Sequence, residues 1–294
     1  LLILLSSMES RKIQKSGTTF YVYLPALWCR EQNITTNSVV FLKQNPRGDL
    51  IIEKKKQEDD QLSLSFELKD TNHEVINKFI VASYINPVKK FEIKFNEKLN
   101  PKQILEHKKI LSGLELLDFE EDKVYCQTTL SLGDPDILLF TMIRKINSMA
   151  SFIKKGTTFE LIERYEMEID KCNLLVNKSI ISSLMHKKDS KLRHVELFYI
   201  GHISKMLEQI ADTLINIKKS NPVLDDILKQ MKNLEIVLEN LNEKSVSSYI
   251  KSISRLENVK VKDSKTFYQK RVYSVLGHIG ETLADWVITK KIDV

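Results

Sequence analysis

Met206-Leu-Glu-Gln-Ile-Ala-Asp-Thr-Leu-Ile215 is the stretch that decides the fold, because its pattern returns at Ile279-Gly-Glu-Thr-Leu-Ala-Asp-Trp-Val-Ile288. In both copies a Glu and an Asp stand four residues apart, which places them on one face of a helix. Like charges at this spacing repel by roughly 0.2–0.5 kcal/mol, so the repeated frame favours a cation or a basic partner beside it. Glu166 and Asp170 have the same spacing outside this frame, at about the frequency expected by chance.

The region 134–292 is predicted to be a helical array built by internal duplication. Apolar stripes with a helical period predict about six helices, in two antiparallel bundles of three joined by short loops. The turn at Gly133-Asp-Pro135 starts the first helix, and Ser220-Asn-Pro222 separates repeats of about 134–219 and 222–292. Each acidic frame then lies on the last helix of its repeat.

This helical region resembles the PhoU family, whose members pair two three-helix bundles and carry an acidic motif in each. The residues that carry the resemblance are Glu208, Ala211, Asp212, Glu281, Ala284 and Asp285. It implies that the four carboxylates bind metal, with iron as the family's usual ion. It also implies a negative regulator of phosphate uptake and phosphate-response transcription, with a phosphate transporter or its signalling proteins as partner.

Oxygen-only ligands suit hard or borderline ions, so magnesium and manganese are alternatives to iron. At about 100° per residue, both acidic pairs lie roughly 160–200° from the apolar stripe of their own helix. The sequence therefore predicts that both pairs lie on the exterior of the bundle. An ordinary solvated acidic surface is the alternative, and the repetition favours a cation or docking site over it.

Residues 8–56 are predicted to form a β-β-α-β-β module, with Gly17 in a turn and a short helix after Pro25. A module this short cannot bury its apolar residues alone, so we expect it to dimerise. The residues at Arg11-Lys12, Lys15-Ser16-Gly17 and Leu24-Pro25 resemble the AbrB/MazE/SpoVT family of swapped-hairpin DNA-binding domains.

The charge of this module agrees with contacts to DNA phosphates. It contains nine basic and four acidic side chains, and so carries most of the net charge of +6. The candidate DNA-binding residues are Arg11, Lys12, Lys15, Arg30 and Arg47. A module that only dimerises, with an ordinary lysine-rich surface, is the alternative. The usual Gly-Asp of the family is Asn37-Ser38 here, and asparagine tolerates the left-handed backbone of such a turn.

Residues 61–133 are predicted to form a small α/β connector, with strands near 62–68, 90–95 and 124–130 and helices near 73–84 and 101–111. The stretches Phe79–Tyr84 and Gly113–Leu117 resemble the connector of archaeal PhoU-like regulators. No metal or nucleophile spacing accompanies the histidines of this segment, so no chemistry is predicted for it.

Bulk composition and motifs limit the function classes. The three cysteines are widely spaced, so we expect no disulfide framework. The sequence has no apolar run long enough to span a membrane. We therefore expect a cytoplasmic protein with no membrane insertion. Met8 is the expected start, with residues 1–7 as an upstream extension. The absence of a P-loop, a Gly-x-Ser-x-Gly motif, a dinucleotide fingerprint and any Glu-x-x-His pair argues against an enzyme.

The predicted fold class is thus multidomain and mainly α: a small β-rich swapped-hairpin domain, a small α/β connector and two three-helix PhoU-like bundles. Two functions follow. In the first, a homodimer binds DNA through the N-terminal module while the helical region reads phosphate or metal status. In the second, the chain is an adaptor that docks on phosphate-transport or signalling proteins and uses the N-terminal module only to dimerise.

Overall fold

The computed structural model describes residues 10–44, 50–54, 63–69, 72–96, 111–120, 122–129, 133–185, 192–256 and 258–292. The chain divides into two compact units, residues 1–60 and 61–294. The expectation of a mainly helical chain with small sheets is confirmed. Within the described ranges, no helix combines the length and the apolar composition needed to cross a bilayer.

The N-terminal unit consists of two hairpins and a short helix. Its elements are β1 (Gln14–Ser16), β2 (Thr19–Tyr21), α1 (Ala26–Glu31), β3 (Phe41–Gln44) and β4 (Leu50–Glu53), with β1 paired to β2 and β3 to β4. Gly17 has φ 59°, as its predicted turn requires. The left-handed asparagine is Asn33, directly after α1, and not Asn37. The turn at Thr35 is closed by Ser38, whose hydroxyl accepts a hydrogen bond from the Thr35 amide.

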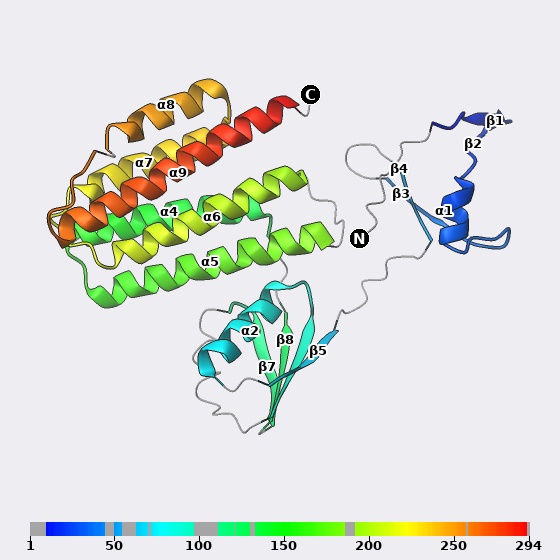
Figure 1. Cartoon of the computed structure of the whole chain (residues 1–294), viewed down its shortest axis with the longest axis horizontal. Coiled ribbons are helices and arrows are strands. Elements are labelled where there is room, and N and C mark those ends of the chain that lie inside the picture. Colours follow the sequence, from blue (N-terminus) through cyan, green and yellow to red (C-terminus); the bar gives the residue numbers. More distant parts are fainter. Residues whose placement is uncertain are drawn as a thin grey trace. The chain divides into compact units, whose positions relative to one another are not determined.

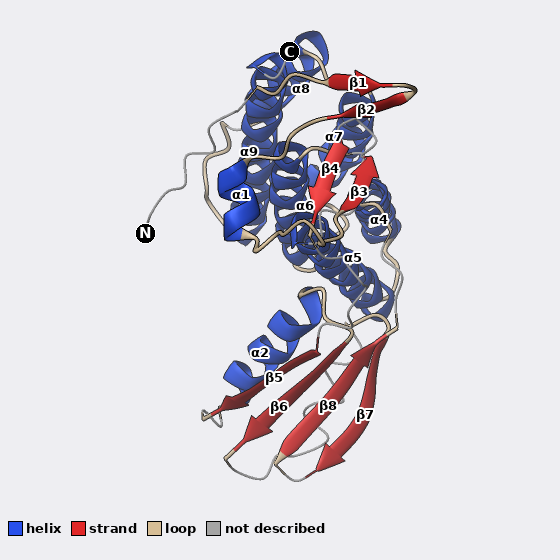
Figure 2. Cartoon of the chain, turned by 90° about the vertical axis from the view of Figure 1, so that its right-hand side faces the viewer, coloured by secondary structure: helices blue, strands red, loops and turns tan. Residues whose placement is uncertain are grey.

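The second unit begins with a four-stranded sheet covered on one side by a helix (Figure 2). Its elements are β5 (Ser63–Leu68), α2 (His73–Ile85), β6 (Lys90–Phe95), β7 (Leu114–Glu120) and β8 (Lys123–Thr128). The strand order is β5-β6-β8-β7, with β5 parallel to β6 and the other neighbours antiparallel. Ile80 and Tyr84 of α2 pack on Ile93 and Val124 of the sheet in one core.

Two features of this sheet differ from the expectations. Strand β7 was not predicted, and the helix predicted over 101–111 lies almost entirely outside the described residues. The cap of α2 is Asn72, whose side chain accepts a hydrogen bond from the Glu74 amide.

Six helices complete the second unit (Figure 1). They are α4 (Pro135–Lys155), α5 (Phe159–Met185), α6 (His194–Leu214), α7 (Val223–Glu239), α8 (Glu243–Ser254) and α9 (Ser264–Ile292). Helices α4, α5 and α6 contact one another, α8 packs on α7 and α9, and the two sets join through α4 with α7 and α6 with α9. One continuous apolar core runs through all six helices.

The ends of α4 follow from its sequence. Pro135 occupies the first turn, where its missing N–H costs nothing, and Gly156 ends the helix with φ 75°. Helix α6 begins where the Arg193 amide donates to the carboxylate of Glu196, half of a capping box.

A buried lysine joins the helical region to the sheet region. Lys178 of α5 donates hydrogen bonds to the carbonyl oxygens of Tyr84 and Asn86 at the end of α2, and its ammonium group lies 4.7 Å from the Tyr84 ring centroid. A cation at a helix C-terminus interacts favourably with the helix dipole. Burial nevertheless lowers the pKa of Lys178 to about 8. This contact holds α5 against α2.

Candidate metal centre

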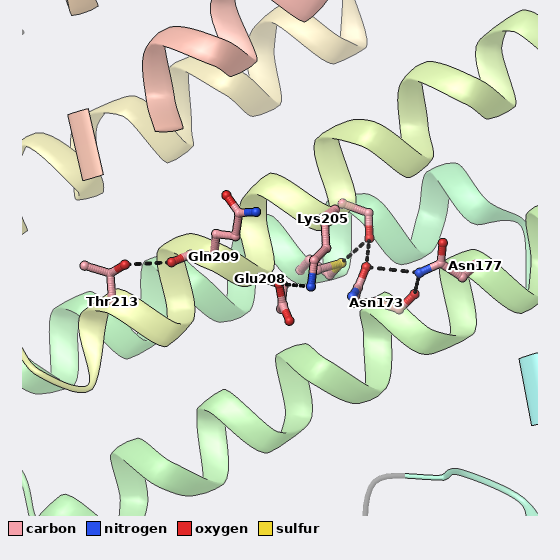
Figure 3. Close-up of polar contacts among 8 residues, drawn as sticks. Asn173, Asn177, Lys205, Glu208, Gln209 and Thr213 are labelled. Atoms are coloured by element: carbon pink, nitrogen blue, oxygen red, sulfur yellow. Dashed lines mark hydrogen bonds and ion pairs between the residues drawn. The ribbon is translucent and has the colours of Figure 1, made fainter. Parts of the chain in front are cut away.

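Helices α5 and α6 form an antiparallel pair whose register is set by a buried polar contact (Figure 3). Ser204 of α6 is fully buried, and its hydroxyl donates to Oδ1 of Asn173 on α5 over 2.8 Å. The side-chain amide of Asn177 donates to the Asn173 carbonyl oxygen over 2.9 Å. Buried polar groups that lack partners are costly, so this contact favours one register of the two helices over its neighbours.

That register brings two acidic pairs together. One turn from Asn173 on α5 lies Asp170, followed by Glu166; one turn from Ser204 on α6 lies Glu208, followed by Asp212. Glu166, Asp170 and Asp212 each offer a carboxylate oxygen, and these three oxygens lie within 4.8 Å of one another. A metal ion with oxygen ligands at about 2.0–2.6 Å can bridge oxygens at such separations.

The carboxylates of this cluster are held in an unfavourable environment. Burial raises the pKa of Asp170 to about 7, with further increases from the charges of Glu166, Glu208 and Asp212. Burial and then neighbouring acids also raise the pKa of Glu166 and of Asp212. The Asp170 Oδ1 atom is buried and has no hydrogen-bond partner. An oxygen that is both buried and unpartnered fits a cation, which would offset its desolvation.

Glu208 and Lys205 border the cluster. Only 15% of the Glu208 side chain is exposed, and its Oε2 accepts from Nζ of Lys205 at 2.6 Å. Glu208 is thus mostly buried, unlike the predicted exterior location, whereas Asp212 is exposed, as predicted. Lys205 is itself a positive charge beside the acids, and it lowers the pKa of both Asp170 and Asp212.

The second acidic frame has a different environment. Glu281 and Asp285 are exposed, as predicted, and neither belongs to a group of three potential ligands among the described residues. Helix α8, which packs on α9, contains a single acidic residue, Glu243, and that side chain pairs with Lys291. Helix α8 therefore does not offer α9 the facing acidic pair that α5 offers α6. Metal binding by Glu281 and Asp285 stays a prediction.

Glu166 and Asp170 are the functional candidates that sequence reasoning missed. Their Glu-x-x-x-Asp spacing lies outside the repeated frame, and a single pair with this spacing is expected by chance. The signal that identifies them is the pairing of two such spacings on consecutive antiparallel helices, because Glu166 then faces Asp212 while Asp170 faces Glu208. That pairing depends on the register of α5 and α6, which the apolar stripes alone do not determine.

The candidate DNA-binding residues lie in the N-terminal unit. Arg11, Lys12, Lys15 and Arg30 are exposed, and Arg47 lies outside the described residues. The ammonium group of Lys15 lies 5.3 Å from the Phe20 ring centroid across the β1–β2 hairpin. These four described cations thus lie at the surface of the unit.

No protein-family model, curated protein or solved structure matches this chain. The resemblances to PhoU and to the swapped-hairpin domains therefore rest on the residues quoted for them.

Proposed function

We propose that the α5–α6 carboxylate cluster binds a divalent cation and that this cation controls a regulatory, non-enzymatic protein. Two observations carry the proposal: carboxylate oxygens of Glu166, Asp170 and Asp212 lie within 4.8 Å of one another, and the Oδ1 atom of Asp170 is buried without a hydrogen-bond partner. Oxygen-only donors favour magnesium, manganese, calcium or iron over softer metals. Because a ligating carboxylate must lose its proton, cation affinity is expected to rise with pH up to about the Asp170 pKa of about 7.

Equilibrium dialysis against Mn²⁺ at pH 7.5, followed by elemental analysis, tests the site. We expect the double variant Asp170→Asn, Asp212→Asn to lose the bound metal that the unaltered chain retains. The matched control is Asp134→Asn, Glu239→Gln, which removes two exposed acidic charges outside both acidic frames and is expected to retain the metal. Equal metal content in the unaltered chain and the site variant would refute the proposal.

For the biological role, we propose a phosphate-responsive regulator of the PhoU type, acting as a negative regulator of phosphate uptake and phosphate-response transcription. The repeated acidic frame and the two sets of three helices support it. Transcripts of phosphate-transport genes should rise under phosphate-replete conditions when the protein is removed. Unchanged transcripts under both replete and starved conditions would contradict the role.

We propose that the regulator acts on transcription by binding DNA through a homodimer of the N-terminal unit. Exposed Arg11, Lys12, Lys15 and Arg30 support it, since phosphate contacts come from accessible cations. Each phosphate contact that is lost reduces the slope of log affinity against log salt by about 0.9, so Arg11→Ala with Lys15→Ala should flatten that slope. Weak binding of equal strength to every DNA sequence would favour the adaptor instead, in which this unit only dimerises.

A further inference from the structure

A groove of about 470 Å³ lies between α4 and α5, and the metal cluster does not account for it. Its lining consists of Thr141, Arg144, Lys145, Ser148, Leu161, Arg164, Tyr165 and Glu168. At about 100° per residue, the lining residues of α5 lie on the opposite side of that helix from Glu166 and Asp170. Glu166 and Asp170 therefore lie on a different side of α5 from the groove, whose three cations come from α4 and α5 together.

The charge of the groove suits an anion. Three lining residues are cationic and only Glu168 is acidic. Lys145 pairs with Glu168 over 3.2 Å inside the groove. The two arginines pair with acids outside the lining: Arg144 with Glu235 and Arg164 with Glu160, each over 2.8 Å.

Both arginines retain the capacity to bind an anion. Their side chains are 68% and 66% exposed, and exposed ion pairs contribute only about 0–1 kcal/mol. Each of these pairs uses one of the five N–H donors of a guanidinium group. Redirecting the remaining donors to a phosphate therefore costs little, and arginine binds phosphate in a bidentate geometry.

The other walls suit an organic group attached to the phosphate. Leu161 and Tyr165 are apolar, and the Tyr165 ring lies 5.3 Å from that of Phe152. The groove has a neighbour of about 150 Å³ that shares Arg144 and Ser148 and includes Asn147, whose Oδ1 is buried without a hydrogen-bond partner. A ligand hydroxyl can donate to that oxygen. The main groove alone falls within the usual range of small-molecule sites, about 300–1,000 Å³.

We propose that the α4–α5 groove binds a small phosphate ester such as a nucleotide, with its phosphate between Arg144, Lys145 and Arg164. This proposal rests on the proposed phosphate-responsive role and names a ligand for it. It can be tested separately from the metal cluster, because the groove and the cluster lie on opposite sides of α5.

Calorimetric titration of the full chain with ADP and with inorganic phosphate, in buffer containing EDTA, tests this site. We expect ADP to bind more tightly than inorganic phosphate. We expect Arg144→Gln with Arg164→Gln to weaken ADP binding at least about tenfold, which corresponds to about 1.4 kcal/mol. The control Arg255→Gln, Lys260→Gln removes the same charge from exposed positions elsewhere and should change ADP affinity less than about twofold.

Three results would overturn the proposal. One is no ADP binding to the unaltered chain at millimolar concentration, and another is an equal loss of binding in the control. A third is inorganic phosphate binding as tightly as ADP, which would contradict the claim that the groove prefers a phosphate ester. The melting temperature and the Mn²⁺ content of the groove variant separate this test from the metal proposal. Both should match those of the unaltered chain. A lower melting temperature would show that the substitutions disturb the fold, and a lower Mn²⁺ content would show that they disturb the metal cluster.

Discussion

Asp170 is the residue on which the metal site depends most. Its pKa of about 7 lies above the usual value for an aspartate, so folding favours its protonated form. Between about pH 4 and pH 7 the unfolded chain has lost this proton while the folded chain keeps it. The contribution of Asp170 to stability therefore falls as pH rises through this window, and stays low above it.

Replacing Asp170 with asparagine should stabilise the metal-free protein at high pH. The expected gain is near zero at pH 4 and about 1–2 kcal/mol at pH 8, a value that already discounts the pKa shift for partial solvent exposure. Urea unfolding in EDTA at both pH values measures it. Asp285→Asn, the same substitution at an exposed position on α9, is the matched control. A uniform loss of stability at every pH in Asp170→Asn would contradict the explanation.

Lys205 is expected to compete with the metal ion. It pairs with Glu208 and is a positive charge at the edge of the cluster, so Lys205→Gln should raise Mn²⁺ affinity about fivefold, or roughly 1 kcal/mol. Calorimetric titration with Mn²⁺ measures the change. Lys229→Gln, an exposed lysine on α7, should leave the affinity unaltered. Weaker binding in Lys205→Gln would mean that Lys205 supports the site.

At the scale of elements, the register of α5 and α6 depends on the buried contact between Ser204 and Asn173. Ser204→Ala should lower the free energy of unfolding by about 1–3 kcal/mol, because Asn173 loses a buried partner. Ser254→Ala is the control, since the hydroxyl of that exposed serine donates only to the backbone carbonyl of Ile250 in its own helix, and a change below about 0.5 kcal/mol is expected. Equal losses of unfolding free energy for the two substitutions, measured by urea unfolding, would contradict the claim that the Ser204–Asn173 contact sets the register of α5 and α6.

The sequence predicts elements better than their pairing. Pro135 and Gly156 mark the ends of α4 because their backbone chemistry is local. The partnership of Glu166 with Asp212 depends on how two helices slide past each other, and many apolar side chains satisfy several registers almost equally. Strand β7 was missed for a similar reason: its hairpin partner is β8, and such pairing is a tertiary preference more than a property of the segment.

At the scale of the whole molecule, the N-terminal unit is the part that needs a partner. None of its residues at 10–42, 44 and 50–54 is buried, and several large apolar side chains are exposed, including Phe20 at 66% and Leu42 at 64%. A module this small requires an additional source of stability. The sequence predicts that a second copy of the chain supplies it.

Sedimentation of the full chain tests this expectation. We expect a dimer, and we expect Phe20→Asp with Leu42→Asp to yield a monomer, since a charge on a buried apolar interface is costly. Ile236→Asp, an equally exposed apolar position at 61% on α7, should remain dimeric. A monomeric unaltered chain would contradict the expected homodimer and, with it, the proposed form of DNA binding.

The most direct test of the central claim is to locate the ion. Crystals of the Mn²⁺-loaded protein at pH 7.5, measured for anomalous scattering, should show a peak at about 2.0–2.6 Å from carboxylate oxygens of Glu166, Asp170 and Asp212. A map with no peak between α5 and α6, or with a peak only at Glu281 and Asp285, would contradict a metal centre built from two facing acidic pairs.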